Sequence, residues 1–199
     1  MRRRFGSCVL TITLCLALTA CGGGATGAEQ LALDIRSEYL AMEGCAAQLA
    51  VTADYGQRVY EYGLYLSYRR EGESVLTVTS PDAVAGVTAR LEDGSGYLEY
   101  DGVWVETGPL DDSGMSPMEA VPVLLRYATE GFIAECAMEE IGEGQVLRVI
   151  CRDPEARAGE GQECSLWFDL DSHALLRGEL SQDGFTVIQC VFSGFAMTE

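Results

Sequence analysis

Hydrophobic residues recur along this chain with two different periods, and the change of period separates predicted helices from predicted strands. In residues 29–43 apolar side chains return every three or four positions, which places them on one side of a helix. They are Leu31, Ile35, Tyr39 and Met42. Gly44 follows this pattern, as glycine commonly follows a helix. One amphipathic helix is therefore predicted at the start of the folded part of the chain.

Beyond Gly44 the period is two, which is typical of strands with one buried face. The alternating segments are residues 47–54, 60–69, 76–78, 87–92, 97–100 and 103–106. The last two are separated by Asp101-Gly102, a strong signal for a two-residue hairpin. Short strands joined by tight turns predict an antiparallel meander.

A second helix is predicted from Ser116 to Gly131. Ser116 is a suitable N-cap, Pro117 fits the first helical position, and Glu119 completes a capping box with the serine. The apolar face of this helix consists of Met118, Val121, Leu124, Leu125 and Ala128. Gly131 ends the helix.

Four strands are predicted after this helix, and the hairpin around residues 152–163 allows a register to be derived. Pairing Cys151 with Cys164 sorts the apolar residues onto one face. The further pairs are then Val149 with Leu166, Leu147 with Phe168, Ile150 with Ser165 and Arg148 with Trp167. A slip of one residue would destroy this sorting. Cys151 and Cys164 would lie within disulfide reach, either joined or as two buried thiols.

The first 21 residues have the pattern of a secretory signal peptide. Three arginines, at positions 2–4, precede an apolar stretch that runs to Ala20. The ending Leu18-Thr19-Ala20-Cys21 resembles a bacterial lipobox, which implies that Cys21 is lipidated. Glycine-rich residues 22–28 follow as a tether of at most ~25 Å. We therefore expect a single domain, residues 29–199, anchored to the membrane through Cys21 on the extracytoplasmic face.

Charge limits the partners of this chain. The formal net charge is −18 over 199 residues, and removal of the three signal arginines takes it to −21. A surface this acidic repels phosphate backbones and anionic lipid headgroups, so nucleic acid is not expected as a partner.

The sequence offers little for catalysis or for a cofactor. It contains no lysine and no Gly-x-Ser-x-Gly motif, and its one histidine, His173, lies in a predicted turn. Five cysteines remain beyond Cys21: Cys45, Cys136, Cys151, Cys164 and Cys190. An odd number cannot be fully paired within one chain, and none has Cys-x-x-Cys spacing. We expect a non-enzyme without a metal or cofactor, in which most of these cysteines are small core residues.

The order of these features resembles the superfamily of lipoprotein carriers and outer-membrane lipoprotein receptors, the LolA- and LolB-like proteins. Residues 96–110, GYLEYDGVWVETGPL, resemble that family's hairpin, and the helix of residues 116–131 resembles its covering helix. The resemblance spans nearly all of residues 29–195. It implies an α+β fold in which a curved antiparallel β-sheet, a half-barrel, is covered by helices. In plan the chain is most similar to the anchored germination lipoproteins of spore formers.

Two functions are compatible with this plan. In the first, the space between sheet and helix is a cavity that binds a hydrophobic ligand or a lipoprotein acyl chain. Its lining would be Tyr60, Tyr62, Leu64, Leu66, Met118, Val121, Leu124 and Leu125. In the second, the space is a filled core, and the anchored protein positions or stabilises an envelope or cell-wall partner, such as one in spore germination. Both use the same residue types, so the sequence leaves both open.

Overall fold

A computed structural model describes residues 27–92, 95–109, 113–142 and 144–198 of the chain. The signal peptide, Cys21 and most of the tether lie outside these residues. Neither of the two helices in the described part of the chain combines the length and the hydropathy that a membrane span requires.

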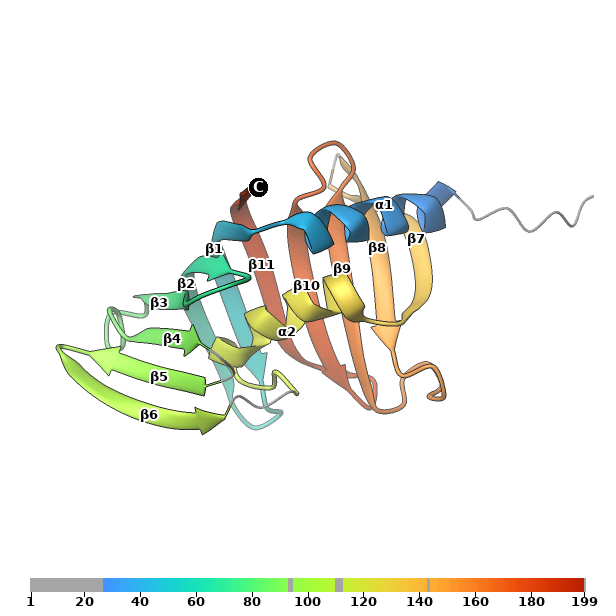
Figure 1. The fold of residues 1–199 in the computed structure, drawn as a ribbon. Helices are drawn as coiled ribbons and strands as arrows, with labels where there is room; N and C mark the ends of the chain where they lie inside the picture. The colour runs from blue at the N-terminus through green and yellow to red at the C-terminus, as the bar shows by residue number, and fades with distance from the viewer. Residues whose placement is uncertain (1–26, 93–94, 110–112, 143, 199) are drawn as a thin grey trace, which may run out of the picture.

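Eleven strands form one antiparallel sheet that curves without closing (Figure 1). The strands are β1 (Gly44–Asp54), β2 (Val59–Arg69), β3 (Ser74–Ser80), β4 (Thr88–Glu92), β5 (Ser95–Tyr100), β6 (Val103–Pro109), β7 (Ile133–Ile141), β8 (Gly144–Arg152), β9 (Gln162–Asp169), β10 (Leu175–Gln182) and β11 (Phe185–Thr198). Their spatial order is β6-β5-β4-β3-β2-β1-β11-β10-β9-β8-β7. Two meanders are therefore joined where β1 pairs with β11, and β6 and β7 are the two edges.

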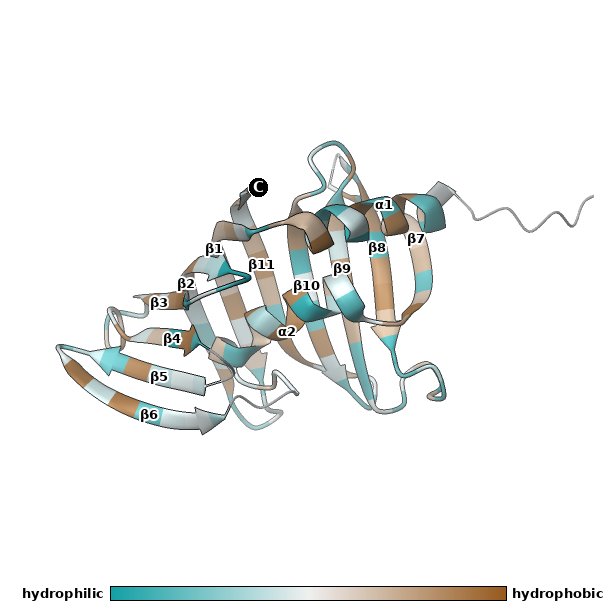
Figure 2. Ribbon diagram, viewed as in Figure 1, coloured by the Kyte–Doolittle hydropathy of each residue, from teal (hydrophilic) through white to brown (hydrophobic). Residues whose placement is uncertain are grey.

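Two helices, α1 (Gly27–Ala41) and α2 (Pro117–Glu130), lie on the same face of this sheet, which we call the inner face (Figure 1). Helix α1 crosses β7 and β8, and α2 crosses β9, β10, β11 and β1. Hydrophobic residues recur along the strands behind the helices and also on β5 and β6 (Figure 2). The α+β half-barrel with covering helices is thus confirmed.

The caps of α2 follow from its sequence and from a contact with α1. The Ser116 hydroxyl accepts from the Glu119 amide at 3.4 Å and donates to the Glu119 carboxylate at 2.6 Å. At the other end, the Arg36 guanidinium of α1 donates to the carbonyls of Ala128 and Gly131. Cationic donors at a helix C-terminus satisfy its last carbonyls and oppose the helix dipole. Arg36 therefore fixes the two helices to each other.

The derived register of the β8–β9 hairpin is confirmed. Cys151 is opposite Cys164, and all four of the further predicted pairs are also present. Both two-residue hairpins have the backbone that their Asp-Gly dipeptides predict, with φ of 50° and 76° at Asp101-Gly102 and 50° and 78° at Asp183-Gly184.

The structure departs from the sequence prediction in three places. Helix α1 ends at Ala41, two residues before the predicted end, and Gly44 is the first residue of β1. Five strands, rather than four, follow α2, because residues 133–141 form the edge strand β7. Its sequence IAECAMEEI alternates weakly, since an edge strand at the rim of the core buries little of either face. Helix α1 begins at Gly27, two residues before the predicted start, so the last two residues of the expected tether belong to the helix.

Candidate functional site

The predicted cavity lining divides into a buried group and a peripheral group. Five of the eight side chains lie in the core between α2 and the sheet, each 3% exposed or less. They are Leu64, Leu66, Val121, Leu124 and Leu125. The structure thus brings this part of the expected lining together, and the side chains pack against one another in a continuous apolar cluster.

Helix α2 lies directly on the backbone of β10. A Cβ atom added at Gly178 would lie 2.6 Å from Cδ1 and 2.8 Å from Cδ2 of Leu124. The leucine thus occupies the space that any side chain at position 178 would need. Where α1 and α2 meet the sheet, beside Ile35 and Phe168, one partly open space has a volume of about 10 Å³. That volume is at the lower limit for one water molecule, roughly 10–15 Å³.

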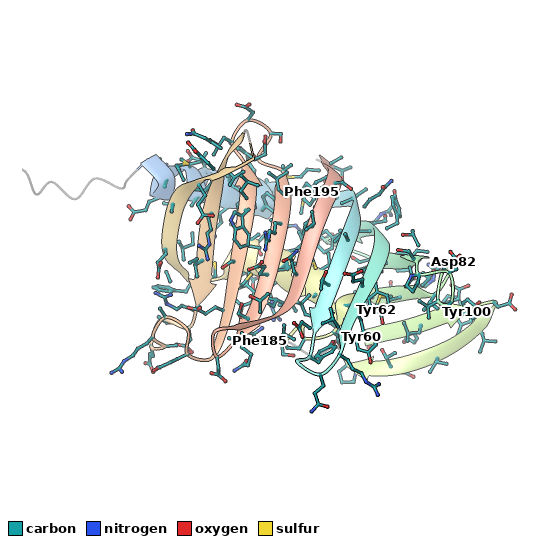
Figure 3. The ribbon with its side chains drawn as sticks, turned by 180° about the vertical axis from the view of Figure 1, so that it is seen from behind. Tyr60, Tyr62, Asp82, Tyr100, Phe185 and Phe195 are labelled. Atoms are coloured by element: carbon teal, nitrogen blue, oxygen red, sulfur yellow. The ribbon has the colours of Figure 1, made fainter. Side chains whose placement is uncertain are left out.

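The other three predicted lining residues lie at the periphery. Tyr62 and Met118 are half-buried against the core, and Tyr60 is 38% exposed. Tyr60 and Tyr62 lie near one end of β2 (Figure 3). The ring of Tyr60 meets Tyr55 edge-on at 6.1 Å, and the Tyr55 hydroxyl donates to the Met115 carbonyl at 2.8 Å. Whether any of the eight residues contacts an acyl ligand stays a prediction.

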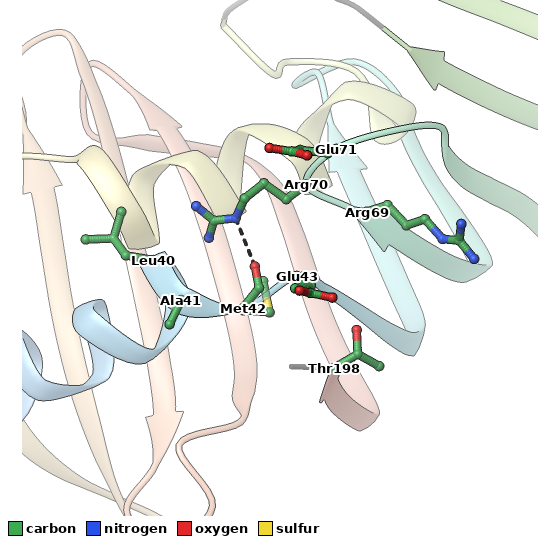
Figure 4. A pocket seen from close by; sticks show the side chains of 8 residues that line it. All are labelled: Leu40, Ala41, Met42, Glu43, Arg69, Arg70, Glu71 and Thr198. Atoms are coloured by element: carbon green, nitrogen blue, oxygen red, sulfur yellow. Dashed lines mark hydrogen bonds between the residues drawn. The ribbon is translucent and has the colours of Figure 1, made fainter.

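A surface hollow of about 610 Å³ lies at the C-terminal end of α1 (Figure 4). Its lining is Leu40, Ala41, Met42, Glu43, Arg69, Arg70, Glu71 and Thr198. The Arg70 guanidinium donates to the carbonyls of Met42 and Tyr39. This arginine therefore caps α1, as Arg36 caps α2, and its charge in the hollow has a structural role.

The inner face of the sheet continues past the helices to the β6 edge. Cross-strand pairing aligns one row of side chains along this face, one residue from each of β1 to β6. The row is Ala47, Leu66, Leu76, Ala89, Leu98 and Val105. Exposure rises from 0% at Leu66 to 57% at Val105. The apolar row thus extends beyond the part of the sheet that α2 covers.

Both faces of this edge carry exposed hydrophobic side chains. On the inner face Tyr100 and Val103 are exposed beside Val105. On the opposite, outer face Trp104 is 53% exposed. We call residues 95–109, the strands β5 and β6, the β5–β6 edge. The sequence predicted this hairpin correctly but not its exposure, because exposure depends on which elements pack above a strand.

The five cysteines beyond Cys21 are free thiols, and four of them are fully buried. Burial raises the pKa of Cys45 and Cys190 to about 12 and that of Cys151 to about 11, from an ordinary value of 9.0. Desolvation is the main cause, because the thiolate loses its hydration in the core. At neutral pH these thiols are protonated and behave as small apolar core residues, as the sequence predicted.

These raised thiol pKa values predict that stability falls at alkaline pH. Above pH 9 the unfolded chain releases thiol protons that the folded chain retains until pH 11 to 12. The unfolded state then binds fewer protons, so the free energy of unfolding decreases as pH rises through this window. Urea titrations at pH 8 to 10.5 under reducing conditions measure the slope. Cys190→Ala is expected to reduce the slope, and a wild-type stability that is flat over this range would contradict the assignment.

His173 connects the turn in which it lies to helix α1. It adopts φ of 55° in the turn between β9 and β10, and its Nδ1 lies 2.8 Å from a carboxylate oxygen of Glu38 on α1. The Tyr39 hydroxyl donates to the His173 carbonyl at 3.1 Å. The turn is therefore fixed to α1, an attachment that the sequence pattern did not reveal.

No family model matches this chain, and no curated protein sequence matches it. Several solved structures are similar to it. An uncharacterized conserved protein from Thermus thermophilus has a TM-score of 0.52 at 10% identity, over 85% of this chain and 87% of that chain. A LolA superfamily protein from Nitrosomonas europaea has a TM-score of 0.42 at 10% identity, over 88% and 95%. A chain in the complex of the CwlD amidase with the GerS lipoprotein, from Clostridioides difficile, has a TM-score of 0.42 at 13% identity, over 98% and 99%.

The likeness to the Thermus thermophilus protein supports the observed fold. That fold is a curved antiparallel sheet with helices on one face. Identities of 10–13% carry no information about its ligand or partner.

Proposed function

We propose that this chain is a membrane-anchored, extracytoplasmic and non-catalytic lipoprotein that binds another envelope or cell-wall protein. The proposed anchor is lipidated Cys21, and the folded domain would follow it closely because the intervening segment is short. The proposal places binding at an exposed surface of the sheet, not in an enclosed cavity.

The observation that carries this proposal is the contact between Leu124 and Gly178. An acyl chain between α2 and the sheet would have to displace Leu124 from a position in contact with the β10 backbone. The same helix leaves Val105 and its neighbours exposed at the β6 edge. Exposed apolar groups next to a filled core favour a partner-binding surface over a carrier cavity.

Acyl-chain binding remains the alternative, and one experiment separates the two. The protein is purified in mild detergent after cross-linking in its own membranes, and binding of a fluorescent fatty acid is measured on the wild type and on Leu124→Asn. We expect a cross-linked protein partner in near-stoichiometric amount and no saturable fatty-acid binding. Saturable binding of the fatty acid to the wild type, displaced by unlabelled fatty acid, would overturn the proposal in favour of the acyl ligand.

A further inference from the structure

The β6 strand is an edge that the fold leaves open to another strand. It pairs with β5 on one side only, and the sheet ends there. In an antiparallel pair every second residue of such a strand directs its N–H and C=O away from the neighbour. Five consecutive residues from Val103 to Thr107 are exposed. The edge therefore offers unpaired backbone groups together with apolar side chains on both faces.

The two tryptophans of the chain differ in the number of arginines that cover their rings, two at Trp167 and one at Trp104. Trp167, on the outer face of β9, lies directly between Arg148 of β8 and Arg177 of β10. The two guanidinium carbons lie 5.1 and 5.0 Å from its ring, and the side chain is only 5% exposed. An interior tryptophan on this face is thus covered by one arginine from each side.

Trp104 has one arginine instead of two, and it comes from β4, because the residue directly opposite Trp104 on β5 is Glu99. One guanidinium, that of Arg90, lies 5.2 Å from its ring and is held there by Glu99 at 3.0 Å and Glu73 at 2.7 Å. On the side away from β5 there is no neighbouring strand in the described structure, and Trp104 is 53% exposed. A strand added to β6 would place one residue directly opposite Trp104. An arginine at that position could stack on the free side of the Trp104 ring, as the two neighbouring arginines do on Trp167.

The negative charge around the β6 edge favours a positively charged partner segment. Residues 88–109 contain five acidic residues and one arginine, and both Asp101 and Glu106 are exposed on or beside β6. Glu106 lies on the same face as Trp104, two residues further along. A second copy of this chain would bring equal negative charge to the edge, and an anionic bilayer would be repelled in the same way.

The position of the edge relative to the anchor also favours a partner from outside the bilayer. The chain enters the domain at Gly27, where α1 lies next to β7, whereas β6 is the opposite edge of the sheet. Ten strand spacings of about 4.8 Å place the two edges roughly 48 Å apart along the sheet. The five residues between Cys21 and Gly27 span at most ~18 Å, so an anchor at Cys21 would lie closer to β7 than to β6.

We propose that the β6 edge binds an extended basic segment of a partner protein by strand addition. Apolar side chains of the segment would cover Val103 and Val105 on the inner face, and an arginine would stack on the free side of Trp104 near Glu106. Strand addition obtains affinity from backbone hydrogen bonds and specificity from alternate side chains. This inference rests on the proposed function, since it names the surface and the chemical class of the partner.

The test uses the full-length protein in neutral detergent and the capped peptide Val-Arg-Val-Arg-Val-Arg-Val at 150 mM salt. The indole N–H resonances of Trp104 and Trp167 are followed by NMR, and Trp104→Phe assigns them. We expect the Trp104 resonance to shift with saturation. The Trp167 resonance should stay in place, because that indole already donates to Glu139 at 2.9 Å under two guanidinium groups.

Four controls make the test specific to the edge. Replacing the central arginine of the peptide by proline removes one charge and one backbone donor, whereas replacing it by alanine removes the charge alone, so the proline peptide should bind at least tenfold more weakly than the alanine peptide. Trp104→Ala, whose affinity is measured by calorimetry because it lacks the Trp104 resonance, should weaken binding of the original peptide about tenfold. Tyr65→Ala removes an exposed aromatic from the same face of the interior strand β2, and it should change affinity less than twofold. Glu106→Arg should reverse the preference toward a glutamate peptide.

Several results would overturn the strand-addition proposal. Equal binding of the proline and alanine peptides, equal effects of Trp104→Ala and Tyr65→Ala, or a shift of both indole resonances would indicate non-specific charge attraction. A concentration-dependent Trp104 shift without peptide, with dimers in sedimentation, would assign the edge to a second copy. Failure of this test alongside a retained cross-linked partner in Trp104→Ala would refute the edge as the binding surface while leaving the proposed function intact.

Discussion

Substitution Cys21→Ala is expected to remove nearly all of the mature protein from the membrane or to leave an uncleaved precursor. A lipidated cysteine carries more than one acyl chain, and each buried methylene contributes about 0.8 kcal/mol. One chain gives only marginal binding, whereas several give stable anchoring. Without them this acidic chain has little affinity for an anionic surface. Fractionation of membranes, with mass spectrometry of the N-terminal peptide, measures the effect.

The matched control is Cys15→Ala, a change of the same kind inside the apolar stretch of the signal. It should leave lipidation and membrane attachment unchanged. An unmodified cysteine at the mature N-terminus of the wild type would contradict the lipoprotein assignment. Retention of cleaved Cys21→Ala protein in carbonate-washed membranes would show that something other than the lipid holds it there.

Substitution Gly178→Val is expected to lower the free energy of unfolding by about 3 kcal/mol, the upper part of the range for overpacked cores. Valine is otherwise favoured in strands, so the loss would come from the Leu124 side chain, three atoms of which lie within 3.1 Å of the new Cβ position. Urea unfolding measures it. Gly144→Val is the control, because a Cβ there has only the Ile141 carbonyl nearby, at 3.8 Å.

A double-mutant cycle shows whether the contact is the cause. Leu124→Ala alone should cost about 2–5 kcal/mol, as truncations of buried leucines do. If Leu124 and residue 178 compete for one space, the double variant should lose less free energy of unfolding than the two single variants together. The difference should be at least about 1 kcal/mol. Additive losses would show that α2 shifts to accommodate the valine, and the interface would then be looser than the structure indicates.

The sequence predicted most elements of this fold because most of them are specified locally. Asp101-Gly102 sets its own hairpin, Ser116 sets the start of α2, and the Cys151–Cys164 register follows from apolar sorting on one face. Strand β7 was missed, since an edge strand needs no strict alternation to be stable once β8 pairs with it.

The binding surface was harder to predict, for a physical reason. Leu66 and Val105 lie on the same face of one sheet and belong to equally good alternating patterns, yet only the first is buried. The difference depends on which elements pack above each strand, and that is a property of tertiary packing. The exposed Trp104 was likewise part of a recognised hairpin, and only the spatial order of the strands shows that it lies at an edge.

The pairing of β1 with β11 has a consequence for how the chain folds. This pairing places Val51 opposite Cys190 in the middle of the sheet. Forming it must overcome the entropy of closing a loop that contains nearly all of the remaining strands. The meanders β1–β6 and β7–β11 involve only neighbouring segments and can form early. A chain exported from its N-terminus would therefore hold two half-sheets until β11 emerges, and the fourteen residues of β11 would complete the domain.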